Sequence, residues 1–131
     1  MSELTDGQIA EIRAELLRRS RELKQEIREI LIRSDQQHHK DLAGAVEDAG
    51  DAAVADMLID IDIALADRRV AELRETESAL QRMAQGIFGK CADCGLEIGY
   101  ERLAAYPVAV RCARCQQRYE KNHFGGTAPT L

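Results

Sequence analysis

The stretch CADCGLEIGYERLAAYPVAVRCARC, residues 91–115, contains every cysteine of the chain. The cysteines form two Cys-x2-Cys pairs, Cys91 with Cys94 and Cys112 with Cys115, and seventeen residues separate the pairs. A two-residue gap lets both thiolates of a pair face one point from a tight turn, and the longer gap allows a small hairpin to bring the pairs together. Zinc takes four thiolates in a tetrahedron, and a fully ligated zinc is structural. The spacing therefore predicts one structural zinc ion.

Other uses of these cysteines match the sequence less well. A redox Cys-x2-Cys would need one pair near a βαβ pattern, which is absent. An iron–sulfur cluster takes the same ligands, and the sequence leaves it open. A catalytic zinc would want an open position or a histidine, whereas His38, His39 and His123 are expected on solvated surface. Gly95 beside the first pair suits a turn that needs a positive φ.

The composition indicates an elongated helical protein with a thin core. Only 4% of residues are aromatic and tryptophan is absent, while proline does not occur before Pro107. The first residues are acidic, unlike a signal peptide, and no segment approaches the length of an apolar membrane span. We therefore expect a cytoplasmic chain, in which thiols stay reduced and four cysteines favour a metal over disulfides.

The net charge is −5, and the acidic residues concentrate between residues 48 and 85. That segment holds nine acids against four arginines. Phosphate binding needs clustered lysine and arginine, so this segment should be repelled by nucleic acid. It suits a basic protein surface or a metal-rich site instead.

The first predicted helical arm covers residues 5–43 and begins at Thr5 or Asp6 as the N-cap. Its apolar stripe combines residues seven positions apart with others that widen it, namely Ile9, Leu16, Leu23 and Ile30, then Ile12, Ile27 and Leu31. A narrow apolar seam with charged flanks is typical of a coiled-coil arm. An ordinary amphipathic helix has the same pattern, and the seam alone does not exclude it.

The second predicted arm covers residues 51–85 and ends before Gly86 as the C′ residue. Its apolar residues recur every three to four positions, namely Met57, Leu58, Ile61, Leu65, Leu73, Leu80, Met83 and Ile87. Two arms of matched length joined by one turn should fold back as an antiparallel hairpin. Residues 44–53 would then form an exposed tip far from the cysteines.

The predicted fold class is thus mainly α. A long helical hairpin, residues 1–86, is followed by a small four-cysteine finger, residues 87–131. The finger would carry a short helix after Arg114 and a flexible tail.

Two carboxylates, Asp48 and Asp51, occupy the predicted tip. One of them is expected to cap the second arm. Carboxylates at a tip can also ligate Mg²⁺ or pair with cations of a partner. Asp60 and Asp62 lack the glycine and downstream ligands of a calcium loop, so we expect them on a solvated face.

These residues resemble the DksA/TraR family of zinc-finger regulators. The finger carries the resemblance in Phe88-Gly89-Lys90-Cys91-Ala92-Asp93-Cys94-Gly95, Ile98-Gly99, Arg102-Leu103, Ala105, Pro107 and Cys112-Ala113-Arg114-Cys115. The tip resembles the family's Asp-x-x-Asp-x-Ala motif, through Asp48, Asp51 and Ala53. The joint occurrence of both motifs at this separation is more specific than either motif alone, and the resemblance covers residues 48–115.

The resemblance implies a bacterial transcription regulator, with no enzymatic activity, that binds RNA polymerase rather than promoter DNA. The hairpin would enter the secondary channel of the polymerase and bring Asp51 and Ala53 near the catalytic Mg²⁺. Arg68 and Arg102 would be contacts to the polymerase or to a nucleotide. A self-paired hairpin also suits a monomer.

The chain departs from the family at positions that face the alarmone ppGpp. Arg68 matches the family, whereas the remaining positions are Ala45, Glu72, Glu75, Tyr106 and Gln116. Carboxylates opposite a polyphosphate repel it. The departures therefore predict weak or absent dependence on ppGpp.

Two other interpretations stay open. Residues 86–131 hold six basic groups against four acids, a small excess for a nucleic-acid-binding zinc ribbon, and no aromatic stacking platform is evident. A non-catalytic coiled-coil adaptor, whose zinc module only caps the hairpin, is compatible with the alanine-rich tip.

Overall fold

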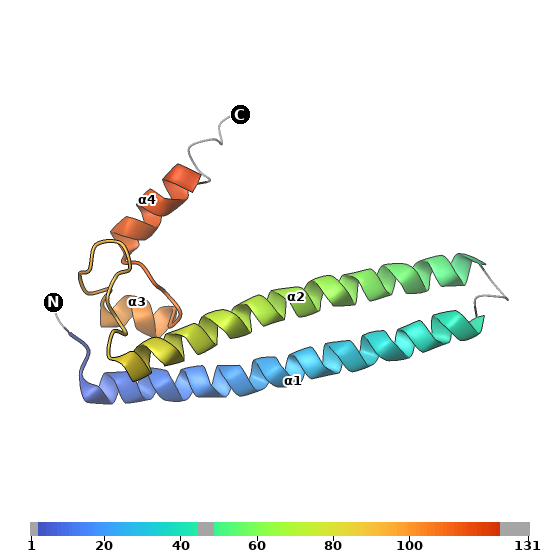
Figure 1. Ribbon diagram of the computed structural model, residues 1–131, viewed down its shortest axis with the longest axis horizontal. Coiled ribbons are helices and arrows are strands. Elements are labelled where there is room, and N and C mark those ends of the chain that lie inside the picture. Colours follow the sequence, from blue (N-terminus) through green and yellow to red (C-terminus); the bar gives the residue numbers. More distant parts are fainter. Residues whose placement is uncertain (1–2, 45–48, 124–131) are drawn as a thin grey trace. The chain divides into compact units, whose positions relative to one another are not determined.

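The computed structural model describes residues 3–44 and 49–123, and it contains four helices within these ranges (Figure 1). They are α1 (Asp6–Gly44), α2 (Ala49–Gln85), α3 (Tyr100–Ala105) and α4 (Ala113–His123). Two compact units divide the chain, and both long helices run through them. The hairpin unit comprises residues 18–44 and 49–75, and the finger unit comprises residues 3–17 and 76–123. The units therefore do not divide at residue 86, which is where the sequence placed the boundary between hairpin and finger.

Helix α1 begins with a capping box at Thr5. The Gln8 backbone N–H donates to Thr5 Oγ1 over 3.1 Å, and the Thr5 N–H donates to Gln8 Oε1 over 3.0 Å. These bonds satisfy N–H groups that the first turn of a helix leaves without partners. Of the two N-cap residues that the sequence suggested, Thr5 is the cap, and Asp6 is the first helical residue.

Helix α2 ends in a Schellman motif at Gly86, whose φ is 78°. The Gly86 N–H donates to the Met83 carbonyl over 3.1 Å, and the Ile87 N–H donates to the Arg82 carbonyl over 3.0 Å. Glycine enters this left-handed conformation without the steric cost of a Cβ. The predicted end of the second arm is confirmed.

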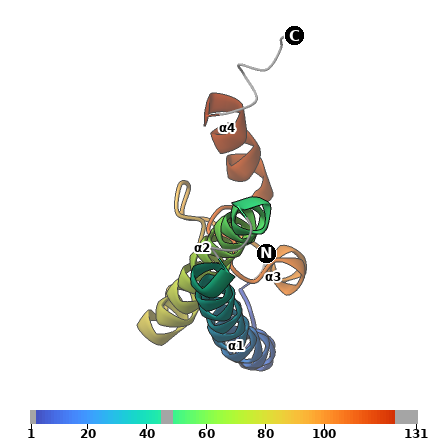
Figure 2. The same ribbon diagram turned by 90° about the vertical axis from the view of Figure 1, so that its right-hand side faces the viewer.

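In the hairpin unit, α1 and α2 lie side by side (Figures 1 and 2). Buried apolar residues of both helices form a seam between them. Leu23 and Ile30 of α1 are buried, seven residues apart, as the sequence predicted. Ala66 of α2 is also buried, and its small side chain suits a close approach of the two helices. The seam is narrow, as expected for a unit in which each helix has a single neighbour.

Ion pairs between the two arms establish that they are antiparallel. Arg19 of α1 pairs with Glu72 of α2 over 2.8 Å, and Arg33 of α1 pairs with Asp62 of α2 over 2.8 Å. Residue numbers therefore rise along α1 as they fall along α2. The predicted fold class, a mainly α chain with a long antiparallel hairpin, is confirmed.

Four side chains close a ring of alternating charge across the seam. Arg19 and Arg69 each contact both Glu26 and Glu72, with nitrogen–oxygen distances between 2.8 and 3.3 Å. The hydrogen bond that Arg19 donates to the Glu72 carboxylate raises the pKa of Arg19 further above its ordinary value. Each half-exposed pair contributes about 0–1 kcal/mol, so the ring acts mainly on the register of the helices.

The structure corrects the prediction for Asp62. This residue is only 8% exposed, whereas the sequence predicted a solvated face, and Asp60 is exposed as predicted. Asp62 lies four residues before the buried Ala66 and so shares its face of α2. The guanidinium of Arg33 contacts its carboxylate, which compensates the charge that the seam partly buries.

Several apolar residues with the predicted helical spacing are not in the seam. Leu31 of α1 and Met57, Leu58 and Ile61 of α2 are between 42% and 56% exposed. A period of three to four residues is satisfied by more than one line along a helix. Packing against a single neighbouring helix covers only one of these lines.

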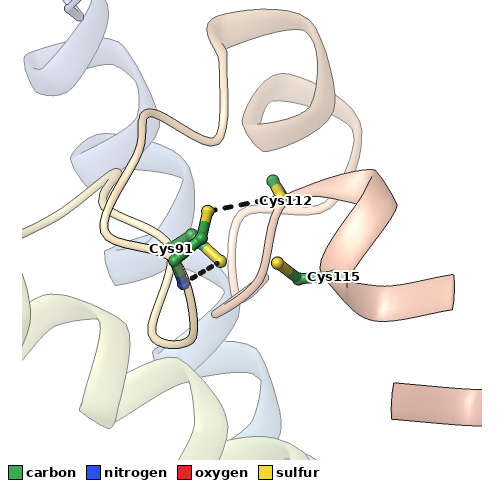
Figure 3. Close-up of side chains that lie close together, drawn as sticks. Cys91, Cys112 and Cys115 are labelled. Atoms are coloured by element: carbon green, nitrogen blue, oxygen red, sulfur yellow. Dashed lines mark hydrogen bonds between the residues drawn. The ribbon is translucent and has the colours of Figure 1, made fainter. Parts of the chain in front are cut away.

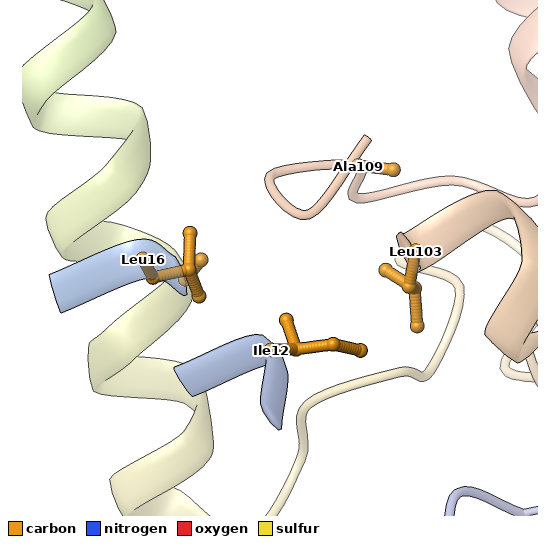
Figure 4. Close-up of a cluster of buried hydrophobic side chains, with 5 residues drawn as sticks. Ile12, Leu16, Leu103 and Ala109 are labelled. Carbon is orange, nitrogen blue, oxygen red and sulfur yellow. The ribbon is translucent and has the colours of Figure 1, made fainter. Parts of the chain in front are cut away.

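The core of the finger unit gathers around Leu103 of α3 (Figure 4). Leu103 is fully buried and clusters with Ile12 and Leu16 of α1, Ala79 of α2 and Ala109. The sequence pattern did not indicate α3, because six residues are too few to show a period. A helix of this length is stable only through tertiary packing, which Leu103 supplies here.

Candidate metal centre

The first cysteine pair lies on a tight turn closed by backbone hydrogen bonds. The Gly95 N–H donates to the Cys91 carbonyl over 3.0 Å, and the Cys94 N–H donates to Cys91 Sγ over 3.5 Å. Gly95 has a φ of 77°, as its place in the sequence predicted. Since a side chain is strained at this φ, glycine is what allows the chain to turn here.

The second pair lies at the start of α4. Cys112 directly precedes the helix, and Cys115 is buried in its first turn. The Gln116 N–H donates to the Cys112 carbonyl over 2.8 Å. The final helix thus begins at Ala113, before the predicted start after Arg114, and the positive end of its dipole favours thiolates.

The four sulfur atoms converge on one point. All lie within 4.8 Å of one another, and the sulfurs of Cys94 and Cys112 are 3.9 Å apart. Figure 3 shows the side chains of Cys91, Cys112 and Cys115 turned toward a common centre. Tetrahedral zinc with Zn–S bonds of about 2.3 Å needs sulfurs roughly 3.8 Å apart, so the thiols fit the ion. In the described ranges no histidine or carboxylate belongs to this group.

The local electrostatics prepare some of the sulfurs for ionisation. Burial raises the pKa of Cys91, but the backbone N–H groups of Cys112, Cys94 and Asp93 lower it by more, to about 6. The backbone N–H of Cys115 lowers the pKa of Cys112, while the Cys112 sulfur raises the pKa of Cys115 to about 12. Four crowded thiolates repel one another, and a divalent cation removes this repulsion and releases the remaining protons.

The residues between the two pairs do not form the small hairpin that the sequence suggested. They contain α3, and the described chain has one isolated antiparallel bridge, between Lys90 and Glu97, whose side chains also pair over 2.6 Å. Helix α3 packs Leu103 into the core and so directs the chain back toward Cys112.

An ion pair that the sequence analysis missed links the two halves of the finger. Arg111 Nε donates to Asp93 Oδ2 over 2.9 Å, and the Arg111 guanidinium lies 4.0 Å from the centre of the Tyr119 ring. Asp93 is inside the first cysteine pair and Arg111 directly precedes Cys112. Each residue is adjacent to a different cysteine pair, and the zinc ion brings the two pairs together. This position in the sequence could have indicated the contact.

Replacing Arg111 with alanine is expected to weaken zinc binding about tenfold, the lower end of the range for groups that position metal ligands. The physical reason is that the two cysteine pairs lose a direct tether. Competition with a chromophoric chelator measures the affinity. Arg114→Ala, an exposed cation on α4, is the matched control, and equal affinities for the two variants would contradict the role of Arg111.

Two arginines that the resemblance nominated differ in their surroundings. Arg102 is half-buried, and its Nε donates to the Arg111 carbonyl over 3.0 Å while its guanidinium lies 5.9 Å from the Tyr106 ring centre. Arg68 is exposed on α2. The remaining surface of Arg102 lines an open depression of about 630 Å³ with Glu101 and Tyr100.

The structure places part of the predicted tip. Asp51 and Ala53 belong to the start of α2, and Ala53 is exposed. Asp48 and Ala45 lie outside the described residues. Of the three histidines, His123 at the end of α4 is exposed and stacks on Tyr119, with ring centres 4.1 Å apart.

A closed site of four thiolates, combined with a long helical hairpin, defines a C4 zinc-finger protein whose metal is structural. The family model for the prokaryotic dksA/traR C4-type zinc finger matches residues 86–121. Residues 86–121 are thus similar to the finger of this family, and Cys91, Cys94, Cys112 and Cys115 bind one structural zinc ion.

The chain is also similar to relatives and to a solved structure over stretches that extend beyond the finger. The chain is 28% identical over 120 residues to the "RNA polymerase-binding transcription factor DksA" of Caulobacter vibrioides, covering 90% of this chain and 80% of the relative. It is 36% identical over 75 residues to an uncharacterized Aquifex aeolicus protein, covering 57% of this chain and half of the relative. The structure of transcription factor DksA2 from Pseudomonas aeruginosa matches with a TM-score of 0.79 and 27% identity, covering 89% of this chain and 86% of that one.

None of the described helices combines the length and apolar character that crossing a membrane requires.

Proposed function

We propose that the chain is a transcription factor that binds RNA polymerase directly and has no enzymatic activity of its own. The observation that carries the proposal is the pairing of a C4 finger with a helical hairpin in the fold of a DksA protein. A relative that aligns over most of the chain is named as an RNA polymerase-binding factor. The zinc site supports the absence of catalysis at the metal, because four thiolates leave no open position for a substrate.

In this proposal the hairpin enters the secondary channel of the polymerase and modulates initiation. Asp48, Asp51 and Ala53 would lie near the polymerase active site, where carboxylates can act on the catalytic Mg²⁺ or on nearby cations. The acidic character of residues 48–85 supports it, since a passage for metal ions and nucleotides accepts such a surface.

Dependence on ppGpp is proposed to be weak or absent. Glu75 is exposed, and its carboxylate would repel a polyphosphate. Glu72 accepts ion pairs from Arg19 and Arg69, so these two arginines are already paired and are not left to bind a nucleotide. Arg102 commits its Nε to the Arg111 carbonyl. Arg68 alone is left as an exposed cation matching the family's position.

Asp51→Asn is expected to abolish the effect of the protein on open-complex lifetime at a ribosomal-type promoter while polymerase binding survives. Asparagine keeps the shape of the side chain and removes the charge that the proposed mechanism needs. Asp67→Asn, an exposed aspartate further along α2, is the control and should keep full activity.

Three outcomes separate the interpretations. Full activity of the Asp51→Asn protein would refute the tip mechanism. Failure of the wild-type protein to bind core polymerase, together with salt-dependent DNA binding, would favour the nucleic-acid-binding interpretation. In that case the cations that would contact DNA are the exposed Arg114, Arg118 and Lys121, which lie on one line of α4. Binding to neither polymerase nor DNA would favour the interpretation as a coiled-coil adaptor.

A further inference from the structure

Helix α2 carries an exposed apolar line that the hairpin does not use. Val54, Met57, Leu58 and Ile61 are between 42% and 56% exposed. They lie at positions i, i+3, i+4 and i+7, which places them next to one another on one face of a helix. We refer to these four residues as the α2 apolar stripe.

The stripe is not needed to hold the two arms together. The seam of the hairpin unit is already formed by Leu23, Ile30 and Ala66, which are buried. Polar side chains at the stripe positions would leave this seam intact and would reduce the apolar surface that is exposed to water. Contiguous exposed apolar residues with polar borders are characteristic of interaction surfaces.

The charges around the stripe define its partner. Residues 49–63 contain four aspartates and no lysine, arginine or histidine. Asp56 and Asp60 are exposed, four residues apart, along a second line of the same helix. Such a surface repels nucleic acid and anionic lipid, and two copies of it repel each other. It complements a protein surface with an apolar groove and a rim of basic residues.

We infer that the α2 apolar stripe docks into an apolar, basic-rimmed surface of RNA polymerase. The inference rests on the proposed function and adds the residues that bind. It follows the general mode in which an amphipathic helix inserts anchors at i, i+3, i+4 and i+7 into a groove. The aspartates at the border steer the encounter and select the rim, while the apolar side chains supply the contact that is lost on dissociation.

The test compares two matched double variants of the full zinc-loaded chain in binding to the core RNA polymerase of the organism that encodes it. Met57→Ser with Ile61→Ser is expected to weaken binding at least tenfold. Leu31→Ser with Ile32→Ser removes two apolar side chains of similar exposure from α1, and its affinity should stay within about twofold of wild type. Circular dichroism verifies that both variants keep their helices.

A photo-reactive phenylalanine analogue in place of Met57 should form a covalent adduct with a polymerase subunit, and the same analogue in place of Ile32 should not. Wild-type affinity of the Met57→Ser, Ile61→Ser variant would overturn the inference and leave the proposed function standing. Absence of polymerase binding by the wild-type chain would overturn both. A dimer in sedimentation that the stripe variant abolishes would assign the surface to a second copy and refute the inference.

Discussion

Removal of zinc is expected to unfold the finger unit while most of the helical hairpin stays folded. Zinc binding to four-ligand modules contributes about 10–16 kcal/mol at neutral pH, more than a unit with this small core can replace. The hairpin unit has its own buried seam and does not use the metal. The expected product of chelation is therefore a chain with an ordered hairpin unit and an unfolded finger.

Two spectroscopic signals distinguish the units. All tyrosines of the chain, Tyr100, Tyr106 and Tyr119, belong to the finger unit, and tryptophan is absent, so tyrosine emission reports on this unit. Residues 18–44 of α1 and 49–75 of α2 belong to the hairpin unit and make up 54 of the 93 helical residues, whereas the finger unit holds the other 39. Chelation should therefore change the tyrosine signal strongly, while the far-ultraviolet circular dichroism of the hairpin unit, more than half of the total, should remain.

Substitution of a ligand should act like chelation. Cys115→Ser removes a buried sulfur from the site, whereas Ala113→Ser changes an exposed neighbour on the same helix and should bind zinc normally. An unchanged tyrosine signal after complete removal of zinc would contradict the structural role of the metal.

Acidification should have the same effect as chelation. Zinc binds thiolates, and Cys91 has a folded-state pKa lowered to about 6 from 9.0. A lowered pKa gives stability that is present above the unfolded value and is lost as the pH falls through the folded value. Zinc occupancy should therefore decrease as the pH falls toward 6 and below.

Leu103→Ala is expected to destabilise the finger unit by about 2–5 kcal/mol, the usual cost of removing a buried leucine side chain. Leu103 has no exposed surface and lies in the cluster where α1, α2 and α3 meet. Truncation loses apolar burial and leaves a cavity among side chains that cannot collapse freely. Urea unfolding of the zinc-loaded chain, followed by tyrosine emission, measures the loss.

The control for this substitution is Leu96→Ala. Leu96 is the same residue type in the same unit but is 61% exposed, so its truncation should change stability by less than about 0.5 kcal/mol. Similar losses in the two variants would mean that the cluster around Leu103 does not stabilise the unit.

Much of the helical hairpin could be predicted because its signals are local. Thr5 and Gln8 are three residues apart, and their capping box needs no other part of the chain. Gly86 permits the left-handed end of α2 for the same reason. Leu23 and Ile30 repeat at the helical period, and an uncovered apolar line of this kind requires a partner helix.

The ligands of the candidate site could be predicted from the sequence, but the surrounding structure that positions them could be predicted less well. Cys-x2-Cys spacing is itself a geometric constraint, which is why both cysteine pairs were recognised. Helix α3 has too few residues for a pattern, and the contact between Asp93 and Arg111 joins positions eighteen residues apart. Neither can be derived before the path of the intervening chain is known.

The sequence by itself determined the ligands of the zinc ion, the two long helices and the end of the second helix at Gly86. Only the tertiary structure decided which apolar line of α2 is buried and which is exposed, and that Asp62 lies in the seam beneath Arg33 while Asp60 remains in water. The physical reason is the distance along the chain over which each interaction acts. Caps, turns and helical periods depend on neighbours within about four residues, whereas burial depends on which distant segment covers a given face.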